Sequence, residues 1–277
     1  MRRAVRVALG LLLAAATPVT AQGVMIAPTA IFMDHGSRSG SVLLYNPGTE
    51  PVEVTISVIF GYPTTDSTGV MYLRTFDAPD STAPSAASWL QAFPRRLTVM
   101  PLERQTVRLL ARPPVGLPDG EYWARLVIAA KGGQVPVSGV PDTADIQVGL
   151  TLEVRSMLGV YYRKGAPRTG VRLSDLAAEL TGDTLEVRGQ LTRTGTAAFL
   201  GTVSAQLVDS AGAVRADFHA PVVVHYAIAP RYRTFAGILA PGRYWLRVRV
   251  ESARDDIDSR LTLPATTLVD SVEVRVP

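Results

Sequence analysis

Short apolar runs separated by turn signals are the feature that most constrains what this chain can fold into. Runs with apolar side chains at alternate positions recur from residues 40–46 to residues 267–276, and Gly, Pro, Asn and Asp lie between them. Alternation is typical of strands with one buried face. Residues 173–180 could hold a turn or two of helix. The strand spacing, roughly one for every eight to twelve residues, predicts an all-β chain of the sandwich type.

An internal repeat divides the chain into two similar parts. Residues 117–126, LPDGEYWARL, align with residues 239–248, LAPGRYWLRV. In each copy a glycine turn is followed two residues later by a tyrosine, Tyr122 or Tyr244, that opens an apolar strand. This looks like the tyrosine corner of immunoglobulin-type sandwiches, in which the hydroxyl bonds to upstream backbone. We therefore expect structural tyrosines and two immunoglobulin-like β-sandwich domains in tandem, over residues 22–164 and 165–277.

Residues 1–21 have the pattern of a cleaved secretory signal peptide. Arginines at positions 2, 3 and 6 precede an apolar run over residues 7–16, and small residues end the segment at Ala21. The apolar run is too short to span a bilayer as a helix. After cleavage before Gln22, no 18-residue apolar run is left, so we expect no transmembrane segment in the mature chain. The expected location is the periplasm.

Charge and composition argue against several functional classes. The chain has 28 Lys and Arg against 24 Asp and Glu. Removal of three arginines with the signal peptide leaves 25 against 24, a net charge of +1 instead of +4. Since no later segment clusters basic residues, nucleic-acid binding has little support. A chain without cysteine also has no disulfide, thiol nucleophile or Cys-based metal site.

The sequence pattern does not support an enzyme. The three histidines, His35, His219 and His225, are scattered, whereas a metal site needs three or four convergent ligands. The sequence has no serine nucleophile elbow and no glycine-rich phosphate loop after a strand. We expect no catalytic residue, no metal and no cofactor.

Several motifs of the first domain belong to one pattern. They are residues 26–29 (IAPT), the turn at residues 45–48 (YNPG), the stretch over residues 93–109, the tyrosine corner at Tyr122, and the ending at residues 160–163 (VYYR). Over residues 24–165 this series resembles the PapD-like periplasmic chaperones of pilus and fimbrial assembly. The second domain resembles the second sandwich of that family in class and size.

The resemblance implies a way of binding a partner. Chaperones of this family lend the last strand of their first domain to an incomplete pilus subunit, and they need no cofactor. The matching segment is residues 145–163, with apolar side chains at alternate positions. The implied partner-strand residues are Ile146, Val148, Leu150, Leu152 and Val154. Alignment on residues 161–163 places the donor positions of the family at Leu150, Leu152 and Val154.

The same segment has a simpler interpretation. Any sandwich strand needs one apolar face to fill its own core. At 19 residues the segment is long, since typical strands have about five to six residues. Its length favours a role beyond one sheet, or a crossing between domains. Donation to a partner and a role as core plus hinge both stay open.

The basic anchor of the family is missing at its usual positions. Typical members hold the terminal carboxylate of the subunit with an Arg on the first strand and a Lys on the last. The matching positions here are Thr29–Ala30 and Gly159, none of which is basic. Arg155 and Arg163 are the nearby cations that could serve as the carboxylate anchor.

The resemblance thus implies a chaperone-like protein that binds the subunits of a pilus or other surface fibre. The alternative is an exported structural or adhesive protein with two immunoglobulin-like domains and no chaperone activity. Burial of Leu150, Leu152 and Val154 between the two sheets would remove the basis for donation. An exposed apolar row at a sheet edge favours donation, because such an edge is an aggregation hazard unless a partner covers it.

Overall fold

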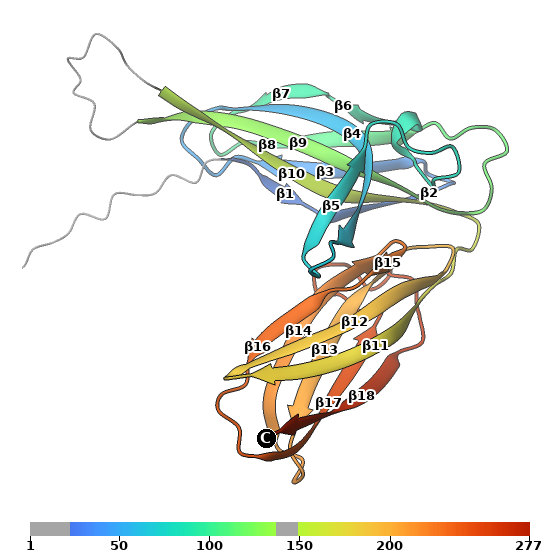
Figure 1. Ribbon diagram of the computed structural model, residues 1–277. Helices are drawn as coiled ribbons and strands as arrows, with labels where there is room; N and C mark the ends of the chain where they lie inside the picture. The colour runs from blue at the N-terminus through green and yellow to red at the C-terminus, as the bar shows by residue number, and fades with distance from the viewer. Residues whose placement is uncertain (1–22, 137–148) are drawn as a thin grey trace, which may run out of the picture.

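The structure is a computed structural model that describes residues 23–136 and 149–277. Two β-sandwiches lie at an angle to each other and are joined by a short connection after residue 164 (Figure 1). The predicted all-β fold with two sandwiches is confirmed. In the described part, one short 3-10 turn at Ala87–Trp89 is the only helical element. The predicted signal peptide, residues 1–21, lies outside the described residues.

The first sandwich consists of two sheets. One has the strand order β1–β3–β8–β6, and the other has the order β2–β10–β9–β4–β5 with β7 beside β4. The strands are β1 (Met25–Ala27), β2 (Ala30–Asp34), β3 (Ser39–Tyr45), β4 (Val52–Thr65), β5 (Met71–Phe76), β6 (Leu90–Phe93), β7 (Arg96–Val99), β8 (Arg104–Ala111), β9 (Gly120–Pro136) and β10 (Gly149–Lys164). All neighbours pair antiparallel except β2 and β10, which run parallel.

The core of the first sandwich follows from the alternation in its strands. In β3, Val42 and Leu44 are buried, whereas Leu43 between them is 40% exposed. Strand β9 differs, because Trp123 and Leu126 are both fully buried although they point to opposite faces. Leu126 belongs to the core between the two sheets, and Trp123 to a cluster shared with the second sandwich. The second sandwich therefore covers the outer face of the sheet that contains β9 around Trp123.

The second sandwich also consists of two sheets. Their strand orders are β11–β12–β15, with β16 beside β12, and β14–β13–β17–β18. The strands are β11 (Thr169–Thr181), β12 (Thr184–Gly195), β13 (Phe199–Val208), β14 (Val214–Val224), β15 (Ala227–Ile228), β16 (Arg231–Phe235), β17 (Gly242–Glu251) and β18 (Leu268–Val276). The fully buried side chains of Phe199, Leu207, Leu246 and Val250 lie in its core.

Residues 173–180 are not helical, because they lie in β11. The register between β11 and β12 shifts between Ser174 and Ala177, and Asp175 has a φ of 55°. A bulge of this kind places extra residues opposite one partner residue and interrupts the alternation of the strand. The apolar side chains on either side of the bulge therefore have a spacing that resembles one helical turn.

The two repeated tyrosines lie at equivalent places in the two sandwiches. The Tyr122 hydroxyl donates to the Pro118 carbonyl at 2.9 Å, and the Tyr244 hydroxyl donates to the Ala240 carbonyl at 2.9 Å. Each bond reaches four residues back, across the turn that leads into β9 or β17. The matching geometry shows that the sequence repeat corresponds to a structural one.

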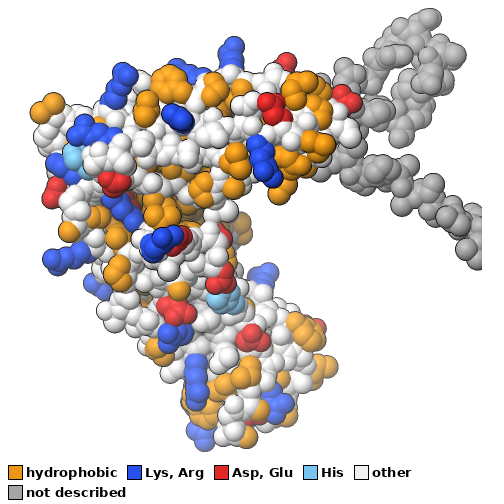
Figure 2. All heavy atoms as spheres, turned by 180° about the vertical axis from the view of Figure 1, so that it is seen from behind, with side chains coloured by type: hydrophobic (Ala, Val, Ile, Leu, Met, Phe, Trp, Pro, Cys, Tyr) orange, Lys and Arg blue, Asp and Glu red, His pale blue; other side chains and the backbone are white. Residues whose placement is uncertain are grey.

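A third apolar cluster joins the two sandwiches, and we call this region the junction. Phe60, Trp123 and Tyr161 of the first sandwich pack there with Ala198 and Leu200 of the second. The hairpin of β4 and β5 also reaches the second sandwich: the Ala229 N–H donates to Thr65 Oγ1 at 2.8 Å, and the Arg231 N–H donates to the Gly69 carbonyl at 3.3 Å. Seen from behind, the molecule is angular, and its surface is hollowed inside the bend (Figure 2).

Candidate functional site

Strand β10 carries the predicted partner-binding residues, and its two halves have different neighbours. Along its length β10 pairs antiparallel with β9. On its other side it pairs with β2, but only over residues 159–163 (Figure 1). Within the described part of the chain, no strand pairs with residues 149–158 on that side. We call residues 149–158 the open half of β10, because their outward N–H and C=O groups have no strand partner there.

Apolar side chains continue from the core into the open half. Val160 and Tyr162 are fully buried, and Leu158 is 6% exposed. On the same face, Val154 is 38% exposed and Leu152 is 45% exposed. The apolar row thus leaves the core of the first sandwich at an unpaired edge. Leu150 also lies in β10, but its side chain is outside the described ones, and Ile146 and Val148 lie outside the described residues.

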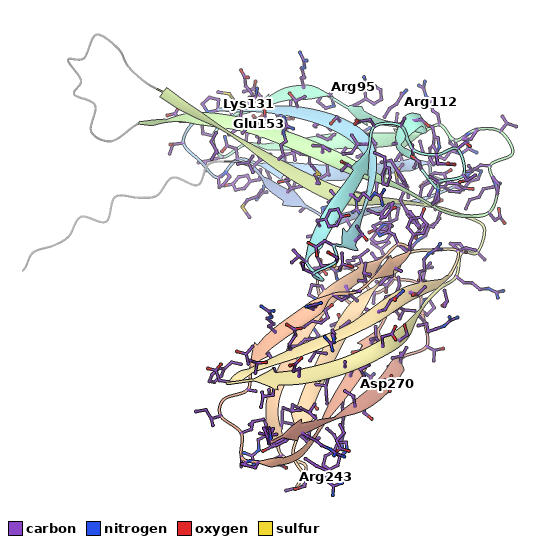
Figure 3. All side chains as sticks on the ribbon, viewed as in Figure 1. Arg95, Arg112, Lys131, Glu153, Arg243 and Asp270 are labelled. Atoms are coloured by element: carbon purple, nitrogen blue, oxygen red, sulfur yellow. The ribbon has the colours of Figure 1, made fainter. Side chains whose placement is uncertain are left out.

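Charged side chains occupy the opposite face of the open half. Lys131 on β9 and Glu153 on β10 lie side by side (Figure 3), with Lys131 Nζ 3.3 Å from Glu153 Oε2. Arg155 Nε lies 2.5 Å from Glu153 Oε1. Hydrogen bonds from Arg155 and Lys131 lower the pKa of Glu153. The apolar side chains Leu152, Val154 and Leu158 of the open half therefore lie on one face, which Ser156 interrupts. The charged side chains lie on the other face together with Met157, which is 43% exposed.

The two predicted anchor arginines have different surroundings. The side chain of Arg155 is 66% exposed and is paired only with Glu153 among the described residues. Arg163 Nε donates to Glu121 Oε2 at 2.8 Å, and its Nη1 donates to the Leu261 carbonyl at 2.6 Å. Glu121 also accepts hydrogen bonds from Trp123 Nε1 and the Ala198 N–H, both at 2.9 Å. Arg163 is thus part of the junction, whereas Arg155 is accessible.

A further cation near Gly159 is not among those predicted. Arg125 on β9 lies directly opposite Gly159 and is 7% exposed. A Cβ atom at residue 159 would lie only 2.9 Å from Arg125 Nη1, so the glycine makes room for the guanidinium group. Arg125 Nε donates to the Gly61 carbonyl at 3.1 Å. The signal for it was one charged residue inside an otherwise apolar strand over residues 122–130.

The other expected anchor position contacts the second sandwich, although Thr29 stays exposed. Thr29 Oγ1 donates to the Asp256 carbonyl at 3.2 Å. Asp256 lies in the loop between β17 and β18, where Arg254 Nη2 is 2.6 Å from Asp256 Oδ2. The hydrogen bonds and charge of Arg254 lower the pKa of Asp256. A loop from the second domain therefore contacts the position at which the family resemblance implies a basic residue.

Metal clusters and membrane-spanning helices are absent from residues 23–136 and 149–277. No group of three or more His, Asp or Glu side chains in these two segments could hold a metal ion. Within the same segments, no helix is long and apolar enough to cross a membrane.

Three solved structures are similar to this chain over most of its length. The Pseudomonas aeruginosa CupB2 chaperone is 13% identical, with 91% of this chain and 100% of that chain covered and a TM-score of 0.44. The Salmonella enterica SafB chaperone, in complex with SafA pilin, gives 15% identity, coverage of 91% and 97%, and a TM-score of 0.43. The pre-assembly complex of CsuC and CsuE from Csu pili of Acinetobacter baumannii gives 12% identity, coverage of 91% and 98%, and a TM-score of 0.43.

No family model matches the chain, and no curated protein matches its sequence. The three solved structures are 12–15% identical to this chain, and their TM-scores are 0.43–0.44. They cover both sandwiches, whereas the sequence motifs lie in the first one. The solved structures that match about 91% of the chain are described as chaperones, two of them in complex with a pilus subunit, and this is the kind of protein that the sequence resembles.

Proposed function

We propose that this chain is a periplasmic chaperone-like protein that binds subunits of a pilus or other surface fibre by lending them the open half of β10. The observation that carries the proposal is the exposed apolar pair Leu152 and Val154 beside an unpaired backbone edge. A subunit that lacks one strand would pair its backbone with this edge and enclose the two side chains. Main-chain hydrogen bonds would supply affinity, and the alternate side chains selectivity.

The cost of leaving this edge exposed supports the proposal. Natural sheets protect their edges with inward-pointing charges, proline, bulges or a covering segment. The register of β10 against β9 shifts between Thr151 and Glu153, yet the open half still presents a leucine and a valine on its core-side face. Full burial of such a side chain contributes about 1.5–3 kcal/mol, so burying the exposed remainder would contribute about 1 kcal/mol for each. A strand of the partner is the covering segment that would both pair with the open backbone edge and bury the apolar side chains of Leu152 and Val154.

Arg155 is the better placed of the two arginines for a carboxylate of the partner. It lies on the open half, and its surface pairing with Glu153 costs little to exchange. Arg163 would have to leave Glu121, whose side chain is fully buried, and separating such a pair is costly. We therefore propose Arg155 as the anchor and Arg163 as a residue that positions the end of β10.

The export signal, the two domains and a function by binding alone are proposed from the sequence. Residues 1–21 direct export and are removed, residues 22–164 form the donor domain, and residues 165–277 form the second domain. The protein acts by binding alone, without catalytic residue, metal or cofactor. The SafA–SafB and CsuC–CsuE structures are complexes of a chaperone with a pilus subunit, and a subunit of that kind is the proposed partner.

The proposal is tested by capture and crosslinking in periplasmic extract. The mature chain with a photo-crosslinking residue at position 154 should retain and label a stoichiometric fibre subunit. Leu152→Glu should abolish this binding, because it places a charge in the groove of the subunit. Val269→Glu is the matched control, since Val269 is 68% exposed on β18 at the edge of the other domain. A monomer without partner would favour the structural or adhesive alternative, and a partner retained by Leu152→Glu would refute strand donation.

A further inference from the structure

A histidine is buried where the two sandwiches meet. His225 lies between β14 and β15 and is fully buried. Three aromatic rings of the first sandwich surround it: Trp123 with ring centroids 4.6 Å apart, and Tyr62 and Tyr161 at 5.9 Å each. These rings come from β9, β4 and β10, so a single side chain of the second domain contacts three strands of the first.

Neither ring nitrogen of His225 has a hydrogen-bond partner among the described residues. Two cations face it, Arg125 from β9 and Arg193 from β12, and Arg193 lies over the Trp123 ring at 5.5 Å. The titratable hydroxyls around it belong to Tyr62, Tyr161 and the adjacent Tyr226. The buried carboxylate of the junction, Glu121, is already bonded to Arg163, Trp123 and Ala198.

This environment accepts the neutral imidazole ring and rejects the charged one. A neutral ring packs among aromatic rings as an aromatic side chain does. An imidazolium would be a buried charge without acceptors, next to two guanidinium groups. Burial and the charges of Arg125 and Arg193 accordingly hold the pKa of His225 well below its usual value of 6.5. A proton can therefore be taken up readily only when the junction opens and water reaches the ring.

We propose that His225 is a pH-sensitive latch between the two domains, which loosens the junction when the medium becomes acidic. The closed form binds fewer protons than the open form below pH 6.5, so acid favours the open form. The closed state has its full stability above pH 6.5. Below that value the ratio of closed to open molecules falls about tenfold for each pH unit, until the pKa of the closed state is reached.

The latch is connected to the strand of the proposed function but does not depend on it. Tyr161, which packs against His225, belongs to β10, and its neighbours Val160 and Tyr162 fill the core of the first sandwich. Loosening of the junction therefore begins at the paired end of the strand whose other end is open. The test below uses the free protein, so its outcome is separate from the capture of a fibre subunit.

Hydrogen exchange between pH 7.5 and 5.0 tests the latch in the mature full-length chain. After correction for the intrinsic exchange rate, peptides over residues 158–164 and 222–228 should open about tenfold more often for each pH unit below 6.5. Peptides of β3 in the first core should not change. His225→Phe, which keeps an aromatic ring but cannot be protonated, should remove the pH dependence. The matched control His219→Phe changes a histidine that is 60% exposed and should behave like the wild type.

An NMR titration of the histidine rings tests the latch even if His225→Phe does not fold. The chain has only three histidines, so their ring signals can be followed by NMR in the wild-type protein. The His225 signal should stay neutral well below pH 6.5, while junction exchange increases. Titration of His225 near 6.5 in the closed protein would overturn the latch. An unchanged pH dependence in His225→Phe, or junction exchange that does not increase in acid, would also overturn it.

Discussion

The two halves of β10 have the same alternating pattern but opposite surroundings. The second half lies between β9 and β2, and Val160 and Tyr162 in it are fully buried. Among the strands that the structure describes, the open half pairs with β9 alone, and Leu152 and Val154 in it are 45% and 38% exposed. The difference shows that one strand can belong to the core at one end and form an exposed edge at the other, which is the edge proposed to bind a partner. What separates the two roles is the length of the neighbouring strand β2, which pairs with five residues of β10.

The largest effect is expected at the paired end, where Arg163 pairs with the buried carboxylate of Glu121 next to the second domain. Glu121→Ala would leave Arg163 without its carboxylate and would remove the acceptor of Trp123 Nε1 and the Ala198 N–H. Loss of one partner from a buried pair costs about 3–5 kcal/mol of unfolding free energy. Urea denaturation of the mature protein measures it. Glu153→Ala is the control in the open half and should leave the denaturation midpoint unchanged. Equal effects of the two substitutions would contradict the difference between the halves.

The next largest effect is expected at the boundary between the halves. Leu158 is the residue of the open half that lies next to the paired end, and it is only 6% exposed. Leu158→Ala would leave a cavity in the core of the first sandwich, which costs about 2–5 kcal/mol. The same urea measurement tests this, and the slope of the transition should stay that of the wild type. A loss below about 1 kcal/mol would show that the core ends before residue 158 and would move the boundary.

The sequence predicted which face of β10 is apolar, but it did not predict where the pairing with β2 ends and the strand becomes exposed. Alternation over residues 145–163 correctly places Leu158, Val160 and Tyr162 toward the core, because the side-chain period of a strand is independent of its neighbours. The end of the cover depends on β2, which lies more than 100 residues earlier in the chain. Contacts of that kind leave no signal in the strand itself.

The same limit applies to the charged residues. Arg163 and Arg155 look equivalent in the sequence, but Glu121 becomes a buried partner of Arg163 only when the second sandwich packs against β9. Arg125 is hidden for a similar reason, since its burial over Gly159 depends on a cross-strand neighbour. The repeat at Tyr122 and Tyr244, by contrast, is local, and each hydroxyl bonds to a carbonyl four residues away. Local geometry could be predicted from the sequence, whereas contacts between strands and domains that are distant in the chain could not.

The smallest effect on stability is expected in the open half, and it separates folding from binding most clearly. Leu152→Ala removes a side chain that is 45% exposed in the free protein, so the unfolding free energy should fall by about 1 kcal/mol or less. In the complex proposed above the same side chain is enclosed by the partner, and its loss should weaken binding by roughly tenfold. Titration calorimetry with the captured subunit measures the second quantity, and urea denaturation the first. If the loss of stability matched that of Leu158→Ala, Leu152 would belong to the core of the first sandwich. The open half would then have no exposed apolar side chain available for a partner. The two halves of β10 would differ only in their backbone pairing.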